Sequence, residues 1–197
     1  MLREQLRSGV AHVGMALREP ELFAVRWNRG EVEYRWWVWV SLVATAVMGT
    51  MFYGMTMGLH GRLQDVLFKG IACTSAAGLA WAIPLPALYI LNSLSGSRLP
   101  ASSTLLAALV TTSWGGLAML ASIPINWFFS VAIPSPSFAL LVNLLVFTGV
   151  GISMSDVFRR VMQHLEPQRG VTPDWWLVLV GVTGAELFYF FGLFRFV

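Results

Sequence analysis

One acidic side chain, Glu186, lies near the middle of the last apolar run of the sequence, residues 175–197. A carboxylate at that depth in hydrocarbon is costly unless it is protonated, paired or hydrated. It could act as a proton or cation relay, or anchor a partner helix. The favoured interpretation is structural, with Glu186 joining helices of this chain. Asn143 is a possible hydrogen-bonding partner, and Lys69 is the nearest opposite charge on another helix.

The other residues that could bind a metal or act in catalysis, such as the histidines, lie too far apart in the sequence to form a recognisable site. His12, His60 and His164 fall in three separate segments outside the apolar runs, so they form no axial pair for a haem. The sequence has no HExxH, CxxC or GxSxG motif. We therefore expect no catalytic residues, no metal ligands and no bound cofactor, and we do not expect an enzyme.

The composition is that of a membrane protein. Of the 197 residues, 56% are hydrophobic and only 12% are charged, whereas soluble domains carry about 25% charged residues. The net charge of +3 comes from dispersed arginines, and no basic run exists that would grip nucleic acid. The lipid bilayer is thus the first expected partner.

Five apolar segments are long enough to cross a bilayer core of about 30 Å, which takes roughly 20 residues per helix. The expected fold class is an all-α membrane protein, a bundle of five transmembrane helices that follows a cytoplasmic N-terminal segment over residues 1–36. The transmembrane domain covers residues 37–197. The expected spans are 37–59, 66–94, 104–123, 137–157 and 175–197.

Prolines predict interruptions in two of these segments. Pro84 and Pro86 fall inside the long second span and predict a kink, because proline removes a backbone donor and crowds the preceding turn. Pro124 predicts another break, at the end of the third span. Residues 122–137 then form an uncharged outer loop that folds back into the interface or is covered by another chain.

The first residues predict an amphipathic helix. Apolar residues recur at steps of three and four over residues 2–18, which places them on one helical face. They are Leu2, Leu6, Val10, Val13 and Leu17. We expect this helix to lie on the membrane surface or on a partner, although packing against the protein's own loops is the alternative.

Small residues at four-residue spacing predict close helix contacts, since they let helix backbones approach where lipid provides no hydrophobic drive. Gly54 and Gly58 are such a pair in the first span, and Gly70, Thr74 and Gly78 continue the spacing in the second. Packing within the chain is favoured over homodimerisation, which stays possible.

The distribution of basic residues predicts the orientation. With the N-terminus inside, ten basic residues lie on the inner side and three on the outer side. The positive-inside rule then places the N-terminus in the cytoplasm and the C-terminus outside. We expect a multi-pass protein of a bacterial inner membrane.

Three segments resemble the Yip family of small five-span membrane proteins, in an uncharacterised bacterial branch. They are ALREPELF before the first span, AIPLPALYILNSLSGSRL at the end of the second, and VGVTGAELFYFFGLFRF at the C-terminus. The resemblance covers most of the chain. It implies a five-span fold and a non-enzymatic role.

These observations favour a non-enzymatic accessory or scaffold subunit of a larger membrane protein assembly. The amphipathic first helix, the uncharged loop and the buried acid all leave surface for other membrane subunits. The alternative is a small transporter or channel with Glu186 in its pathway, because interrupted helices can line a substrate site. The sequence does not identify the partner or the process.

Overall fold

The computed structural model describes residues 2–32, 35–59, 61–133, 135–169 and 177–194. The described residues form α-helices and one short 3-10 helix, with no strand among them, which confirms the expected all-α class. The helices are α1 (Leu2–Arg18), α2 (Pro20–Asn28), α3 (Arg35–Thr56), α4 (Leu63–Ala82), α5 (Leu85–Leu94), α6 (Ala101–Ala132), α7 (Pro136–Leu165), η1 (Pro167–Arg169) and α8 (Leu177–Phe190).

Four of the described helical segments are long and apolar enough to cross a membrane. They are α3, the α4–α5 segment Leu63–Leu94, α6 and α7. Their large apolar side chains cover the outside of the bundle as well as its inside, and Phe68, Ile152 and Leu145 are each more than 60% exposed. Such a surface suits a lipid environment and not water.

The prolines of the second span interrupt its helix as predicted. α4 ends at Ala82 and α5 begins at Leu85, with Pro84 as the preceding cap residue and Pro86 in the first turn of α5. Proline is tolerated in a first helical turn because the amide hydrogen it lacks has no intrahelical acceptor there. The break leaves α4 with 20 residues, about 30 Å of helix.

The expected break at Pro124 is wrong. α6 continues through Pro124 to Ala132, and only residues 133–135 separate it from α7. Apolar surroundings favour continued helix, because each backbone group that leaves the helix needs another partner. The hydroxyl of Ser122 also donates to the carbonyl of Ala118, 2.8 Å away. The uncharged outer loop expected over residues 122–137 is therefore mostly helix.

The last helix ends earlier than expected. α8 stops at Phe190, and Gly192 adopts a φ of +70°, a conformation that side chains other than glycine rarely adopt. The amide of Leu193 then donates back to the carbonyl of Phe188, 3.0 Å away. Phe194 returns to the bundle and is buried. The remaining ends of the expected span, residues 175–176 and 195–197, lie outside the described residues.

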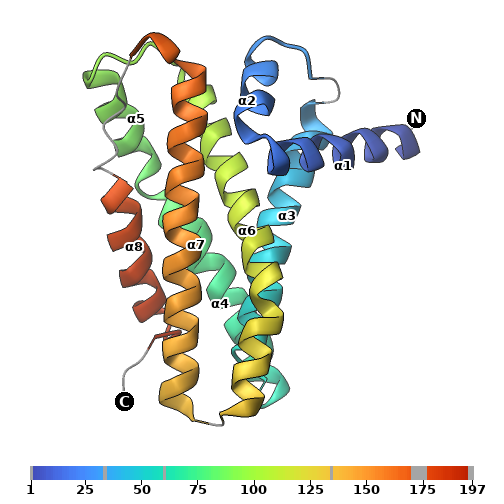
Figure 1. Ribbon diagram of the computed structural model, residues 1–197, viewed down its shortest axis with the longest axis vertical. Helices are drawn as coiled ribbons and strands as arrows, with labels where there is room; N and C mark the ends of the chain where they lie inside the picture. Colours follow the sequence, from blue (N-terminus) through green and yellow to red (C-terminus); the bar gives the residue numbers. More distant parts are fainter. Residues whose placement is uncertain (1, 33–34, 60, 134, 170–176, 195–197) are drawn as a thin grey trace.

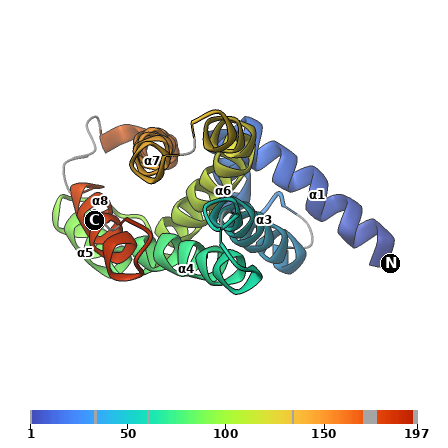
Figure 2. The same ribbon diagram turned by 90° about the horizontal axis from the view of Figure 1, so that it is seen from below.

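The long helices run roughly side by side, and two short helices gather at one end (Figure 1). α3 packs against α6 on one side and α4 on the other, α7 packs against α6, and α8 packs against α4. Figure 2 shows α7 and α8 apart from each other around the other helices. We call the end that carries α2 and α5 the α2 end, and the opposite end the turn end, after the α6–α7 turn.

α1 lies across the bundle axis near the α2 end and projects from the side of the bundle (Figure 1). Its C-terminal half packs on the protein itself, since Val13 and Ala16 are buried in the core that contains Phe23 of α2. The side chains of Leu2, Leu6 and Val10 lie outside the described residues.

The glycine pattern marks one helix interface correctly. A Cβ on Gly54 would lie 2.6 Å from the carbonyl oxygen of Lys69, and one on Gly58 would lie 2.6 Å from the Cα of Val66. Gly70 faces α3 from the other side, where a Cβ would lie 3.2 Å from the carbonyl oxygen of Met51. These three glycines let α3 and α4 pack closely, as small residues do in membranes.

Gly78 does not belong to this interface, contrary to the expectation. It is exposed, and a Cβ there would meet nothing within 4 Å. α3 and α4 have separated at that level, and the close contact of α3 has passed to α6. Gly116 of α6 meets Ala46 there, where an added Cβ would lie 2.8 Å from the Cα of Ala46.

Candidate functional site

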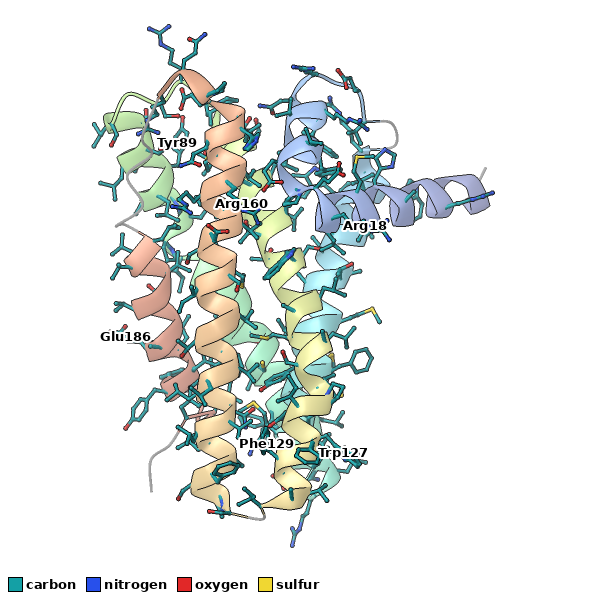
Figure 3. The ribbon with its side chains drawn as sticks, viewed as in Figure 1. Arg18, Tyr89, Trp127, Phe129, Arg160 and Glu186 are labelled. Atoms are coloured by element: carbon teal, nitrogen blue, oxygen red, sulfur yellow. The ribbon has the colours of Figure 1, made fainter. Side chains whose placement is uncertain are left out.

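Glu186 lies on the outward face of α8. Its side chain is exposed, and Figure 3 shows it on the side of α8 that faces away from the other helices. Val178 and Val182, two turns and one turn before it, are 64% and 51% exposed, and Tyr189 is 64% exposed. Among the described residues, none forms a hydrogen bond or ion pair with the Glu186 carboxylate. We call this stripe, Val178, Val182, Glu186 and Tyr189, the Glu186 face.

The contacts of α8 place Glu186 along the length of the bundle. Phe188, two residues later, packs its ring against that of Phe147 of α7, with centroids 4.4 Å apart. Phe147 lies eleven residues after Pro136 at the start of α7, which is about 16 Å along the helix. Glu186 is therefore far from the turn end. Figure 3 places it between Arg160 near one end and Trp127 near the other.

The side chains considered as internal partners of Glu186 are used elsewhere. The Asn143 carbonyl oxygen accepts a hydrogen bond from the Tyr53 hydroxyl, 2.8 Å away, and its amide nitrogen donates to the Ala139 carbonyl. The Lys69 ammonium donates to the carbonyl of Met57, 3.0 Å away, just after α3 ends. A cation there satisfies a carbonyl that the helix end leaves without an amide donor.

Buried polar contacts join the helices and were not foreseen from the sequence. The Tyr53–Asn143 bond links α3 to α7, and the Asn126 amide donates to the Thr56 hydroxyl, 2.8 Å away, linking α6 to α3. The sequence did show that Asn126 and Asn143 would each need a hydrogen-bonding partner, because both amides lie inside or beside apolar runs. The partner itself depends on which helices are neighbours.

Two charged clusters tie the helices together at the α2 end. Arg160 of α7 lies 2.6 Å from the Glu21 carboxylate of α2 and 3.0 Å from that of Asp156. Arg169 of η1 donates to the side chain of Asn92 and to its carbonyl, and so joins η1 to α5. Charged pairs of this kind sit where helices leave a membrane, within reach of water.

A cavity of about 1260 Å³ lies among α3, α4, α6, α7 and α8. Its lining is largely aliphatic and aromatic, and it includes six glycines, of which Gly78, Gly151 and Gly181 have open space around them. Asp156 and Arg159 line it as well, and they form an ion pair of 2.6 Å. The cavity is larger than ligand pockets of roughly 300–1,000 Å³.

Glu186 does not line this cavity, although its neighbours Ala185 and Gly184 do. Val178, Val182 and Tyr189 line it as well, so the cavity reaches the Glu186 face, and of the four residues of that face only Glu186 lies outside the lining. Within the described ranges, no three His, Cys, Asp or Glu side chains are grouped closely enough to hold a metal ion.

The chain was compared with protein-family models, curated proteins and solved structures, and nothing in any of the three matches it. The structure and sequence thus place it as an all-helical membrane protein with four long apolar helical segments among its described residues.

Proposed function

We propose that this chain is a non-enzymatic subunit of a larger membrane protein assembly, and that the Glu186 face of α8 is where a transmembrane helix of a partner docks. The observation that carries the proposal is the exposed carboxylate at Glu186. Toward lipid, such a group is costly whether it is charged or left without a hydrogen-bonding partner.

A partner helix that presents a lysine, an arginine or a hydrogen-bond donor would remove this cost. The residues before Glu186 on this face suit such contact, because the exposed side chains of Val178 and Val182 form a narrow apolar stripe against which a partner helix can pack. Intramembrane acids commonly mark functional contacts for this reason. A second copy of the chain would bring two carboxylates together, so it suits the face less well.

The rival function, a transporter or channel with Glu186 in its pathway, has less support. A pathway through the bundle would use residues that line its interior, and Glu186 points the other way. The cavity of about 1260 Å³ among the helices is lined mainly by apolar residues, which does not suit an ion path.

The proposal includes a fifth span and an orientation. We place residues 175–197 across the membrane as the fifth span, with α8 as its helical part, in a bacterial inner membrane. The helix ends that carry most arginines gather at the α2 end (Figure 1), which supports a cytoplasmic location for that end and for α1 on the membrane surface. The resemblance to the Yip family agrees with this arrangement and stays a prediction.

The test is the size of the assembly in mild detergent after extraction from native membranes. The wild-type chain should migrate as part of a larger complex. Glu186→Leu should release it at the size of a single chain, and Val182→Phe should weaken the complex by blocking the same face. Leu145→Phe makes a similar change on the exposed surface of α7 and should leave the complex intact.

Two results would overturn the proposal. One is a wild-type chain that is stable, monomeric and free of partners under these conditions. The other is an intact complex for Glu186→Gln together with loss of ion flux in liposomes, which would favour transport.

A further inference from the structure

The lining of the cavity changes from apolar to charged toward the α2 end. Along most of α7 the lining residues are apolar or small, from Leu144 to Gly151. One to two turns later Asp156 and Arg159 line the same cavity, each of them close to half exposed. A cavity that is apolar along most of its length and carries opposite charges at one end matches a membrane lipid, whose apolar acyl chains end in a charged headgroup.

On its α7 side the cavity is lined from Leu144 to Arg159, which are fifteen residues apart in α7, about 22 Å. One leaflet of a bilayer has nearly the same depth, about 20–22 Å, when its polar headgroup region is included. Within this stretch Phe147 meets Phe188 of α8, with ring centroids 4.4 Å apart.

The cavity is shorter than a membrane-spanning helix, which must extend for about 30 Å. Its depth suits a single lipid, with the acyl chain among the apolar residues and the headgroup beside Asp156 and Arg159.

We propose that the cavity binds an acyl chain of a glycerophospholipid from the leaflet at the α2 end, with the lipid phosphate beside Arg159. The guanidinium complements the phosphate, and the Asp156 carboxylate suits an ammonium group in the same headgroup. This site shares Val178, Val182 and Tyr189 with the Glu186 face but does not include Glu186, and it does not rest on the proposed assembly.

Three glycines make the proposal testable, because they line the cavity and have open space around them. A Cβ on Gly78, Gly151 or Gly181 would meet nothing within 4 Å. Leucine side chains at these positions would enter the cavity from α4, α7 and α8, and their Cβ atoms would meet no neighbour within 4 Å. Gly149 is the matched control, since it lies two residues from Gly151 in the same helix, has the same open surroundings and does not line the cavity.

The experiment uses the full chain in liposomes that contain phosphatidylethanolamine with a diazirine on one acyl chain. After illumination, labelled peptides are mapped, and lipid retained through detergent exchange is counted by native mass spectrometry. We expect labels on cavity residues of α4, α7 and α8. The triple variant Gly78→Leu, Gly151→Leu and Gly181→Leu should retain about tenfold less lipid, as expected when a hydrophobic pocket is filled, whereas Gly149→Leu should match the wild type.

A second variant tests the headgroup. Arg159→Gln should lower the retention of phospholipid relative to an uncharged diacylglycerol probe, with cavity labelling by the latter unchanged. Folding is monitored through Cys73, which is buried and is the only cysteine in the chain, so a folded variant keeps the slow thiol labelling of the wild type. Equal lipid retention by the wild type and a folded triple variant would refute the proposal. So would labels confined to the outer surface, or loss of a protein subunit instead of lipid.

Discussion

Replacing Gly116 by alanine at the close crossing of α3 and α6 should destabilise the protein, whereas the same replacement at Gly149 of α7 should not. A Cβ on Gly116 would lie 2.8 Å from both the Ala46 Cα and the Thr45 carbonyl oxygen. Both neighbours are backbone atoms, so no side chain can turn aside. Gly116→Ala must therefore separate the two helices by about 0.6 Å to reach an ordinary contact of 3.4 Å.

The cost follows from the dispersion energy lost across the crossing. A gap of 0.5–1 Å forfeits about a quarter to a half of each contact, and each heavy-atom pair contributes about 0.1–0.2 kcal/mol. For roughly 30 such pairs the loss is about 1–2 kcal/mol, within the range of about 1–3 kcal/mol found for overpacked cores. Replacing glycine by alanine in a helix returns about 0.5–1 kcal/mol.

Gly149→Ala isolates the steric contribution. Gly149 also lies inside a long helix, but a Cβ there meets nothing within 4 Å. The gain in helix propensity is then the same for both variants and cancels in their difference. We expect Gly116→Ala to be less stable than Gly149→Ala by about 1–3 kcal/mol, with Gly149→Ala at or slightly above the wild type.

The assay is unfolding in mixed micelles, in which a denaturing detergent is titrated against a mild one. Helix content by circular dichroism and thiol labelling of the buried Cys73 give two independent midpoints. Equal midpoints for the two alanine variants would show that α3 and α6 do not cross closely at Gly116, and the arrangement of the bundle would be wrong.

Three further predictions use the same unfolding assay or a reporter. Tyr53→Phe should cost about 0.6–1.7 kcal/mol because it removes the donor to Asn143; in a double-mutant cycle with Asn143→Leu, a coupling energy of zero would contradict the bond. Arg169→Met should cost about 1.5–3 kcal/mol, since the largely buried guanidinium donates to the side chain and the carbonyl of Asn92; an unchanged midpoint would refute this contact. A reporter fused after Val197 and active only outside the cytoplasm should be active, and cytoplasmic activity instead would overturn the proposed orientation.

Features with a local cause could be predicted from the sequence. The apolar runs required helices, because hydrocarbon leaves backbone groups no partner except one another. The break at Pro84 and Pro86 follows from the chemistry of proline within its own turn. The close approach of α3 and α4 at Gly54 and Gly58 follows from the missing side chains.

Proline and glycine gave wrong expectations at positions where the neighbouring helices decide the local structure. Pro124 does not end α6, because the apolar surroundings hold the following residues in a helix. Gly78 has the spacing of a packing glycine, yet α3 has turned toward α6 at that level and leaves the space open.

The sequence by itself determined that this chain belongs in a membrane, that its long apolar runs are helical, and that an acid lies near the middle of the last of these runs. Only the tertiary structure decided that Glu186 points outward, that Asn143 pairs with Tyr53, and that a cavity remains beside α7. The reason is physical. In water, an apolar face must be buried, so its pattern reveals the inside of a protein. In lipid, apolar side chains are equally stable facing other helices or acyl chains, so the pattern does not reveal which face is covered.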